Sequence, residues 1–163
     1  MIIKLKNKDK LIVGDFFLNC AIGKMGLTKN KVEGDLKTPK GIFSIDKLYY
    51  RKDRIKSVRT KLQKIEIKKN FVWCNDVDSK YYNKRTKISK NYKFEKLFRQ
   101  DKKYDMLIPI KYNWNKITKG KGSAIFLHLI GNYKTTAGCI ALSKKDFLVM
   151  LNLIDKNTKI KIS

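Results

Sequence analysis

The chain has 163 residues and a hydrophobic content of 42%, which suits one compact domain with a buried core. No stretch approaches the roughly 18 uninterrupted apolar residues of a membrane-spanning helix, so we expect no transmembrane segment. The net charge of +25 invites a nucleic-acid interpretation, but the lysines are spread along the whole chain without a basic block. We therefore expect no specific nucleic-acid function; charge alone leaves room for a general affinity for anionic polymers.

The N-terminal segment is expected to be the first strand of the mature fold, because charges occupy the place where a signal peptide carries its apolar stretch. Extended segments dominate the chain, as alternation and β-branched or aromatic content indicate. Pro109 suggests that its strand is irregular or lies at an edge. Residues 51–61 and 77–103 receive no assignment. The expected strands are 2–5, 11–22, 41–50, 62–67, 104–112 and 123–130, the last apolar on both faces and therefore buried.

One helix is expected at about 143–155. Ser143, with Asp146 three residues later, makes a start like a capping box. Apolar side chains then follow at helical spacing: Phe147, Leu148, Leu151 and Ile154. The chain closes with the short alternating strand TKIKIS. Together these elements predict a mainly β fold with one helix, a sandwich or a partly closed sheet, as a single domain over 1–163.

The three cysteines, Cys20, Cys74 and Cys139, are far apart and form no CxxC pair. A zinc site built from them and the single histidine lacks ligand spacing, so we expect no metal and no other cofactor. A disulfide between Cys20 and Cys74 can form in an oxidising compartment and would leave Cys139 unpaired. An odd cysteine is a candidate reactive thiol.

His128 is the only histidine and lies in the most apolar strand. Taken alone, it is best interpreted as a core histidine bonded to the backbone, because an unpaired buried polar group costs about 1–3 kcal/mol. A polar loop, GNYKTTAG, follows the strand and leads to Cys139, with ten residues between the two. A strand, a turn and a return segment can place the thiol beside the ring.

A cysteine nucleophile needs such a neighbour, because the thiolate is the reactive form and a free thiol has a pKa of about 8.5. An imidazole can take the thiol proton and later return it to a leaving amine. Gly138 lets backbone N–H groups approach a substrate oxygen and bind the oxyanion of a tetrahedral intermediate. The alternative is that Cys139 is a small buried apolar residue. No Asp or Glu stands out as a third member, so a backbone carbonyl would orient the ring.

The segment IFLHLIGNYKTTAGCIALS resembles the catalytic segment of the bacterial L,D-transpeptidases (YkuD-type domain), in which a histidine in a strand precedes a G-C pair. Upstream, NCAIGKMGLTKNKVEGDLKTPKGIF resembles the G-D-x-x-T-P-x-G-x-F strand pair of that family. YYRKDR, WCNDVDSKYYNK, YDMLIPIKYN and GKGSAIF are similar to a branch with Y-R-x-D-R, W-C-D-D and Y-N elements. The resemblance runs from about residue 19 to the C-terminus.

The resemblance implies that Cys139 is the nucleophile and His128 the general base. The Leu129 carbonyl would orient the ring, and the amides of Gly138 and Cys139 would serve the oxyanion. Two residues replace the family's usual histidine before the G-C pair and its arginine after it: Ala137 and Ala141. These departures remove contacts to substrate or structure, but neither the nucleophile nor the base.

Further polar and aromatic residues are candidates for substrate binding, and each has a structural alternative. Arg51 and Arg54, with Asp53, either hold a substrate carboxylate or form a surface ion-pair cluster. Trp73 either lines a cleft or packs in the core, and Cys74 beside it is expected to be buried. The loop entering the third predicted strand is expected to be shaped by Lys31, Glu33, Asp35 and Thr38. The substrate-binding candidates are Arg51, Arg54, Trp73, Asp76, Tyr82, Asn83 and Thr136.

The resemblance implies a two-step acyl transfer on peptidoglycan stem peptides. Cys139 would attack an L,D-linked amide of a tetrapeptide, D-alanine would leave, and an amine of a second stem would attack the thioester to form a 3-3 cross-link. One alternative is an L,D-carboxypeptidase or amidase that hydrolyses stem peptides on the same scaffold. An alternative of another class is a non-catalytic basic module that binds anionic wall polymer or nucleic acid. The sequence leaves the acceptor open.

The resemblance also implies a place in the bacterial cell envelope, the periplasm, which contrasts with the charged N-terminal segment. There the partners would be peptidoglycan stem peptides and anionic envelope polymers, and we expect a monomer. Carbapenem-type β-lactams would acylate Cys139, because their strained amide carbonyl mimics that of the substrate.

Overall fold

A computed structural model describes residues 1–130 and 134–163, and most of their regular structure is β. Among these residues the one helix is α1 (Lys144–Leu153). The strands are β1 (Ile2–Lys6), β2 (Lys10–Val13), β3 (Phe16–Ala21), β4 (Leu27–Thr28), β5 (Thr38–Pro39), β6 (Gly41–Ser44), β7 (Leu48–Tyr50), β8 (Lys64–Glu66), β9 (Phe71–Cys74), β10 (Arg85–Lys87), β11 (Phe94–Lys96), β12 (Met106–Pro109), β13 (Phe126–Leu129), β14 (Ile140–Leu142) and β15 (Lys159–Ile162).

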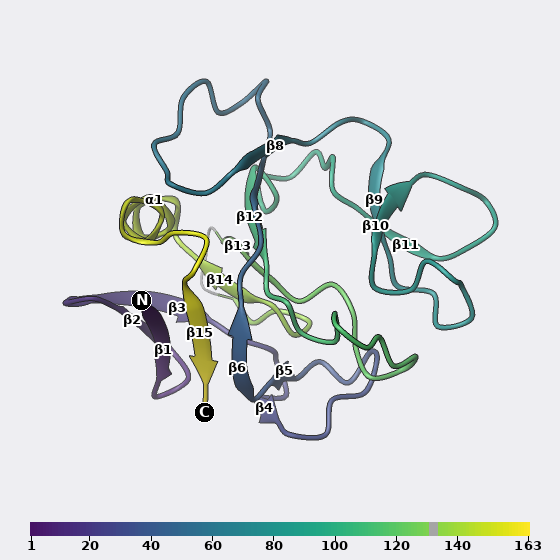
Figure 1. The fold of residues 1–163 in the computed structure, drawn as a ribbon, viewed down its shortest axis with the longest axis horizontal. Helices are drawn as coiled ribbons and strands as arrows, with labels where there is room; N and C mark the ends of the chain where they lie inside the picture. The colour runs from purple at the N-terminus through teal and green to yellow at the C-terminus, as the bar shows by residue number, and fades with distance from the viewer. Residues whose placement is uncertain (131–133) are drawn as a thin grey trace.

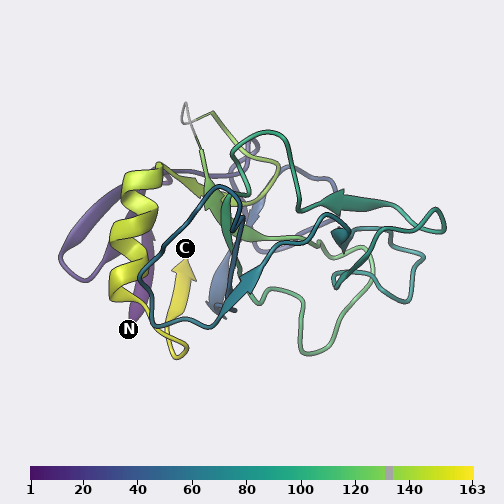
Figure 2. The ribbon, with the colours of Figure 1, turned by 90° about the horizontal axis from the view of Figure 1, so that it is seen from above.

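The strands form one large curled sheet and two small ones. The large sheet has ten strands in the order β6-β15-β1-β2-β3-β14-β13-β12-β7-β8, and the small sheets have the orders β10-β9-β11 and β4-β5. Figure 1 shows α1 and the strands β1 to β3 at one end of the molecule and the three-stranded sheet at the other. Figure 2, turned by 90°, shows the same separation. The mainly β fold with one helix confirms the predicted fold class.

Two predicted strands are each broken into two. The segment 11–22 forms β2 and β3, joined by a turn in which Gly14 has a φ of +58°, a conformation that glycine adopts without steric cost. The segment 41–50 forms β6 and β7. Because β6 pairs with β15 whereas β7 pairs with β12 and β8, the chain changes its neighbours between them. Each break contains polar or turn-forming residues, Gly14 and Asp15 in the first and Asp46 and Lys47 in the second, but the apolar residues on both sides outweighed them in the prediction.

Pro109 lies in an interior strand of the large sheet, so the suggestion that its strand is an edge strand is wrong. β12 lies between β13 and β7. Pro109 is its last residue, beyond the two that pair with β7, so its missing N–H interrupts no bond of that ladder. The strands β9, β10 and β11 were not predicted, because strands of three or four residues among lysines show little alternation.

The helix begins as predicted. Ser143 is its N-cap, and the side chain of Ser143 accepts a hydrogen bond from the Asp146 N–H at 3.1 Å. Its buried side chains are Phe147, Met150 and Leu151, and they belong to the larger of two hydrophobic clusters. The helix therefore covers one end of the large sheet.

A second, smaller cluster lies between the large sheet and the three-stranded sheet, and it includes Trp73, Phe126 and Cys139. Cys20 and Cys74 are buried free thiols in different sheets, so the disulfide considered for them is not formed. Within the described part of the chain, no helix is long and apolar enough to cross a membrane.

Candidate active site

The pairing of β13 with β14 brings Cys139 to the face that carries His128. The two strands run parallel, with His128 opposite Ala141. Cys139 directly precedes β14 and lies beside Phe126, the first residue of β13, whose N–H donates to Cys139 Sγ at 3.3 Å. Side chains two residues apart on a strand share a face, so the thiol and the imidazole project to the same side. Residues 131–133 of the polar loop between them lie outside the described residues.

The thiol of Cys139 is buried and protonated at rest. Sγ donates a hydrogen bond to the Ala124 carbonyl at 3.2 Å, and the residue is 8% exposed. Burial, together with the negative charge of Glu95, raises the pKa of Cys139 to about 12. To act as a nucleophile at neutral pH, this thiol needs a base that takes its proton during the attack.

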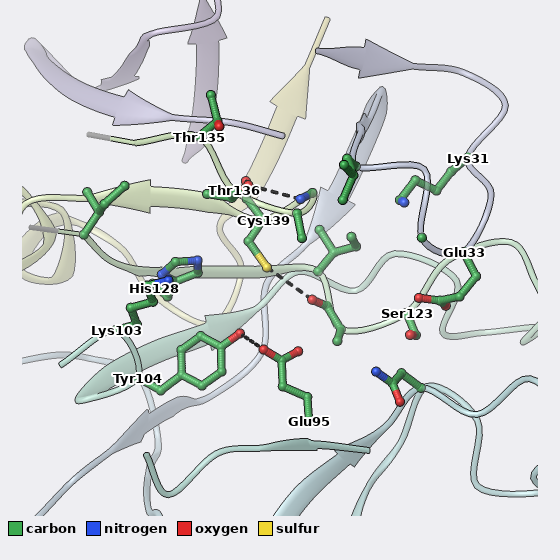
Figure 3. A pocket seen from close by; sticks show the side chains of 18 of the residues that line it. Lys31, Glu33, Glu95, Lys103, Tyr104, Ser123, His128, Thr135, Thr136 and Cys139 are labelled. Atoms are coloured by element: carbon green, nitrogen blue, oxygen red, sulfur yellow. Dashed lines mark hydrogen bonds between the residues drawn. The ribbon is translucent and has the colours of Figure 1, made fainter. Parts of the chain in front are cut away.

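The imidazole of His128 is held in the neutral form that such a base requires. Burial lowers the pKa of His128 to about 4. Nδ1 lies 2.8 Å from the Leu129 carbonyl oxygen, which can only accept, so Nδ1 carries the hydrogen and Nε2 keeps its lone pair. The Tyr104 ring packs edge-on against the imidazole, with 5.3 Å between centroids, and limits its rotation. Figure 3 shows that the imidazole and the thiol belong to the same cavity.

The turn before Cys139 requires a glycine. Gly138 has a φ of +141°, and a Cβ at this position would lie 2.9 Å from the Lys37 carbonyl oxygen. The buried Thr38 donates from Oγ1 to the Gly138 carbonyl at 2.8 Å. Thr136 accepts from the Gly138 N–H at 3.1 Å and donates to the Cys139 carbonyl at 2.6 Å. The Gly138 N–H is thus already bonded, and it would have to leave Thr136 to serve an oxyanion.

A cavity of about 520 Å³ opens over the thiol and the imidazole (Figure 3). Of the predicted site residues, Cys139, His128, Gly138 and Thr136 line it. The other lining residues are Lys31, Glu33, Gly34, Leu36, Asn75, Glu95, Arg99, Lys103, Tyr104, Ser123, Ala124, Ile125, Ile130, Lys134, Thr135 and Ala137.

Arg51 and Arg54 lie outside this cavity, beside a separate hollow. The Arg51 guanidinium donates to both carboxylate oxygens of Asp53, at 2.8 and 2.6 Å, and lies 3.5 Å from the centroid of the Phe98 ring. Arg54 donates to Asp105 at 2.8 Å. The structure therefore gives both arginines internal partners and does not bring them to the thiol.

Trp73 and Asn83 support the cavity wall without lining it. Trp73 is 2% exposed, packs edge-on against Phe126, and donates from Nε1 to Asn83 Oδ1 at 3.0 Å. The same oxygen accepts from the Ala124 N–H at 3.1 Å. Because the Ala124 carbonyl holds the thiol, this buried pair fixes the acceptor of the Cys139 hydrogen bond.

Tyr82 also acts through another residue, and Asp76 lies away from the cavity. The Tyr82 hydroxyl donates to Glu33 and accepts from the Gly122 N–H at 3.0 Å. Asp76 accepts from the Lys93 N–H at 2.9 Å and so joins a turn to the three-stranded sheet. Neither side chain lines the cavity.

The lining residues that the sequence analysis did not single out include four polar ones: Asn75, Glu95, Tyr104 and Ser123. Tyr104 donates its hydroxyl hydrogen to Glu95, which comes from β11. Asn75 and Glu95 lie in short segments with no clear periodicity, and only Glu95 offered a signal through its rarity, as one of three glutamates in the chain. Tyr104 opens a predicted strand, and its aromatic side chain suggested only core packing.

The loop that contains Lys31 is braced by its own charges. Lys31 is 4% exposed and pairs with Asp35, which also accepts from the Lys37 N–H at 2.9 Å. Residues 1–130 and 134–163 contain no group of three or more His, Cys, Asp or Glu side chains able to hold a metal ion.

Comparison with known proteins identifies the fold and the family of the chain. The helical cell shape determining protein Pgp2 from Campylobacter jejuni shares the fold (16% identity, TM-score 0.54, covering 99% of this chain and 46% of that one). The solved structure of Bd1075 from Bdellovibrio bacteriovorus is similar at 17% identity, with a TM-score of 0.49, covering 99% of this chain and 47% of that one. The chain spans about half the length of each, and no curated protein matches it. A family model for the YkuD L,D-transpeptidase catalytic domain matches residues 4–162. The chain therefore belongs to the YkuD family of L,D-transpeptidase catalytic domains.

Proposed function

We propose that this protein is a peptidoglycan L,D-transpeptidase that uses Cys139 as its nucleophile and His128 as its base. One observation carries the proposal: a protonated thiol and a neutral imidazole lie on the same face of paired strands, under one cavity. Membership of the family supports the reaction class. The similar Campylobacter jejuni protein is described as a cell shape determinant, which agrees with a peptidoglycan substrate.

In the first step the thiol attacks the carbonyl of an L,D-linked amide in a stem tetrapeptide. The S–C bond forms as the thiol proton passes to His128 Nε2, and the carbonyl oxygen becomes an oxyanion. When the oxyanion collapses, the C–N bond breaks and the imidazolium returns the proton to the leaving amine of D-alanine. The products are free D-alanine and a thioester on Cys139.

In the second step an acceptor attacks the thioester. An amine nitrogen forms the new C–N bond, its proton passes to His128, and the C–S bond breaks. The proton then returns to the sulfur and restores the resting thiol. Water as acceptor gives a carboxypeptidase, which shares the first step and differs only in the product.

The neutral resting pair has a physical consequence for this mechanism. The pKa of the thiol is raised and that of the imidazole is lowered, so the charged pair is disfavoured before substrate binds. Charge then develops only while the carbonyl is attacked, where the Leu129 carbonyl stabilises the imidazolium. We therefore expect general-base catalysis rather than a preformed thiolate.

Mass spectrometry of the protein incubated with purified muropeptides tests this proposal. We expect an acyl adduct on Cys139, released D-alanine and a 3-3 linked dimer. A carbapenem-type β-lactam is a second acylating probe of the same thiol. Release of D-alanine without a dimer would identify a carboxypeptidase, and an inert Cys139 towards both probes would identify a non-catalytic module.

Further expectations accompany this proposal. We propose that 1–163 acts as a single catalytic domain and a monomer. Its partners would be peptidoglycan stem peptides and, through its charge, anionic envelope polymers. Because peptidoglycan is its proposed substrate, we place its action in the bacterial cell envelope.

A further inference from the structure

Five neighbouring strands of the large sheet, β6, β15, β1, β2 and β3, have one buried side and one exposed side. Side chains alternate along each strand, and the inward ones pack in the hydrophobic cluster that also contains the buried side chains of α1. We call the exposed side the outer face. Its side chains are those of Ile2, Lys4, Lys6, Lys10, Ile12, Phe17, Asn19, Ile42, Ser44, Lys159 and Lys161.

The strand register sets lysines of the outer face directly opposite one another. Lys4 on β1 is the partner of Lys161 on β15, and Lys6 on β1 is the partner of Lys10 on β2. Like charges in opposite positions of a strand pair repel and destabilise the sheet. The folded protein therefore keeps an unfavourable concentration of positive charge here, which an anionic partner would offset.

The charge of the outer face is not compensated within its own strands. The five strands contain five lysines and no Asp, Glu or Arg. Asp9 and Asp15 lie in the turns at the strand ends. Within the described residues, none of the five lysines takes part in an ion pair, in contrast to Lys31 and Lys111, which pair with aspartates. The outer face is thus a basic surface that lacks internal counter-ions.

Large apolar side chains lie among these lysines. Ile2 is 47% exposed, Phe17 63% and Ile42 58%. A soluble polyanion would neutralise the lysines but offers little apolar surface, whereas an anionic bilayer offers both charged headgroups and acyl chains. A second copy of the outer face would bring lysines against lysines, which repulsion disfavours. Charge and apolar exposure together therefore favour a membrane surface.

We propose that the outer face is a docking surface for a bilayer that contains anionic phospholipids. The lysines would bind headgroup phosphates, and the side chains of Ile2, Phe17 and Ile42 would reach the boundary between headgroups and acyl chains. No side chain of the outer face lines the cavity over Cys139, so the docking surface and the candidate active site are separate. The proposal does not rest on the proposed acyl transfer.

Co-sedimentation with lipid vesicles tests the docking surface. Vesicles of equal parts phosphatidylcholine and phosphatidylglycerol are compared with vesicles of phosphatidylcholine alone. We expect binding to the mixed vesicles only, and release at high salt because the charges are screened. The double variant Lys4→Gln/Lys161→Gln should weaken binding by about tenfold to thirtyfold, since each lysine near an anionic membrane contributes about fivefold. Phe17→Ser should weaken it by about threefold to tenfold through the loss of apolar contact.

The three-stranded sheet at the other end of the molecule offers matched controls (Figure 1). Lys87→Gln/Lys90→Gln removes the same charge from exposed positions on and near β10. Ile88→Ser removes an apolar side chain that is 48% exposed. Both controls should bind the mixed vesicles as the unmodified protein does. Affinities of the outer-face variants equal to those of their controls would overturn the proposal.

Two further measurements separate folding and catalysis from docking. Circular dichroism checks each variant, and Ile42→Ser replaces Phe17→Ser if the latter does not fold. The release of D-alanine from soluble muropeptides should be unchanged in Lys4→Gln/Lys161→Gln, because neither residue lines the cavity. Loss of vesicle binding with unchanged release is the result expected of a docking surface.

Other occupants of the outer face would give different results. Binding to soluble polyphosphate or to a single-stranded oligonucleotide that requires Lys4 and Lys161, without binding to mixed vesicles, would assign the face to a soluble polyanion. A dimer in analytical ultracentrifugation that Phe17→Ser dissociates, again without vesicle binding, would assign it to a second copy of the chain. Either result would overturn the membrane proposal.

Discussion

Two candidate sites of the molecule differ in how their polar groups are hydrogen-bonded. One is the seam between β13 and β14, which carries His128 and Cys139, and the other is the cluster of Arg51 and Arg54. In the seam, burial keeps Cys139 and His128 uncharged, and both residues line the cavity. In the cluster both guanidiniums are charged and bind internal oxygens, and Arg51 donates to the Arg99 carbonyl as well as to Asp53. A polar group can do chemistry only when a hydrogen-bonding position remains open to a substrate.

The largest difference between the two sites is expected when the proposed nucleophile is removed. Cys139→Ala should abolish release of D-alanine, because no other thiol lines the cavity within the described residues. The loss of a buried sulfur should leave the fold intact, as circular dichroism can check. Cys74→Ala is the control, since Cys74 is fully buried in β9 and should lose stability but not activity. Substantial turnover by Cys139→Ala would remove this cysteine from the mechanism.

The next largest effect is expected from His128→Gln. Glutamine retains a polar side chain of similar length but cannot accept a proton, so the rate of the acylation step should fall by roughly 10²–10⁴-fold. Single-turnover release of D-alanine measures this rate. The rate of Cys139 alkylation by iodoacetamide against pH gives a second readout, and it should be lower in the variant at neutral pH. Identical pH–rate curves would return His128 to the role of a core residue.

The neutral state of the seam also predicts how stability depends on pH. The pKa of His128 is about 4 in the folded protein and near 6.5 when unfolded, so between these values the unfolded state binds more protons. The unfolding free energy should therefore fall by up to about 3 kcal/mol as the pH drops from 6.5 towards 4. Urea titrations of the protein and of His128→Gln isolate this effect. An equal pH dependence in both would show that the imidazole is not buried in its neutral form.

Substitutions in the Arg51–Arg54 cluster should lower the free energy of unfolding and leave the release of D-alanine unchanged. Arg51→Ala removes the bond to the Arg99 carbonyl and the packing on Phe98, and should cost about 1–3 kcal/mol of unfolding free energy. Arg51→Lys should recover only part, because an ammonium cannot reproduce the planar fork. Denaturant midpoints measure both, and D-alanine release should persist in the folded fraction. A selective rise in the KM for muropeptide would instead restore Arg51 as a substrate-binding residue.

Much of the fold could be anticipated from local pattern. Alternation located β1 and β15, the Ser143 cap located α1, and the apolar run 123–130 located the buried β13. The break in 11–22 has a local signal at Gly14 and Asp15 that the prediction did not use, whereas the break in 41–50 depends on which strands lie alongside.

The candidate site divides in the same way. The order of histidine, glycine and cysteine in the chain was enough to select the proposed nucleophile and base. A strand, a loop and a second strand beside the first can bring the histidine and the cysteine to one face of a sheet. Whether Arg51 can bind a substrate depended on Asp53, Phe98 and Arg99, which surround its guanidinium in the folded protein. No pattern in the sequence shows that the N–H donors of Arg51 are already hydrogen-bonded.

The sequence by itself determined the family and the helix start and selected Cys139 and His128 as the proposed catalytic pair, because these depend on contiguous motifs. Only the tertiary structure decided that Thr38 holds Gly138 across 100 positions and that Glu33 reaches the same cavity as Glu95. It also decided the protonation of the pair, since the pKa of a buried group depends on its surroundings in space. Contacts between residues distant in the sequence, and the exclusion of water from a side chain, arise only when the chain is folded. The sequence around a residue therefore does not show which distant residues will contact it or how deeply it will be buried.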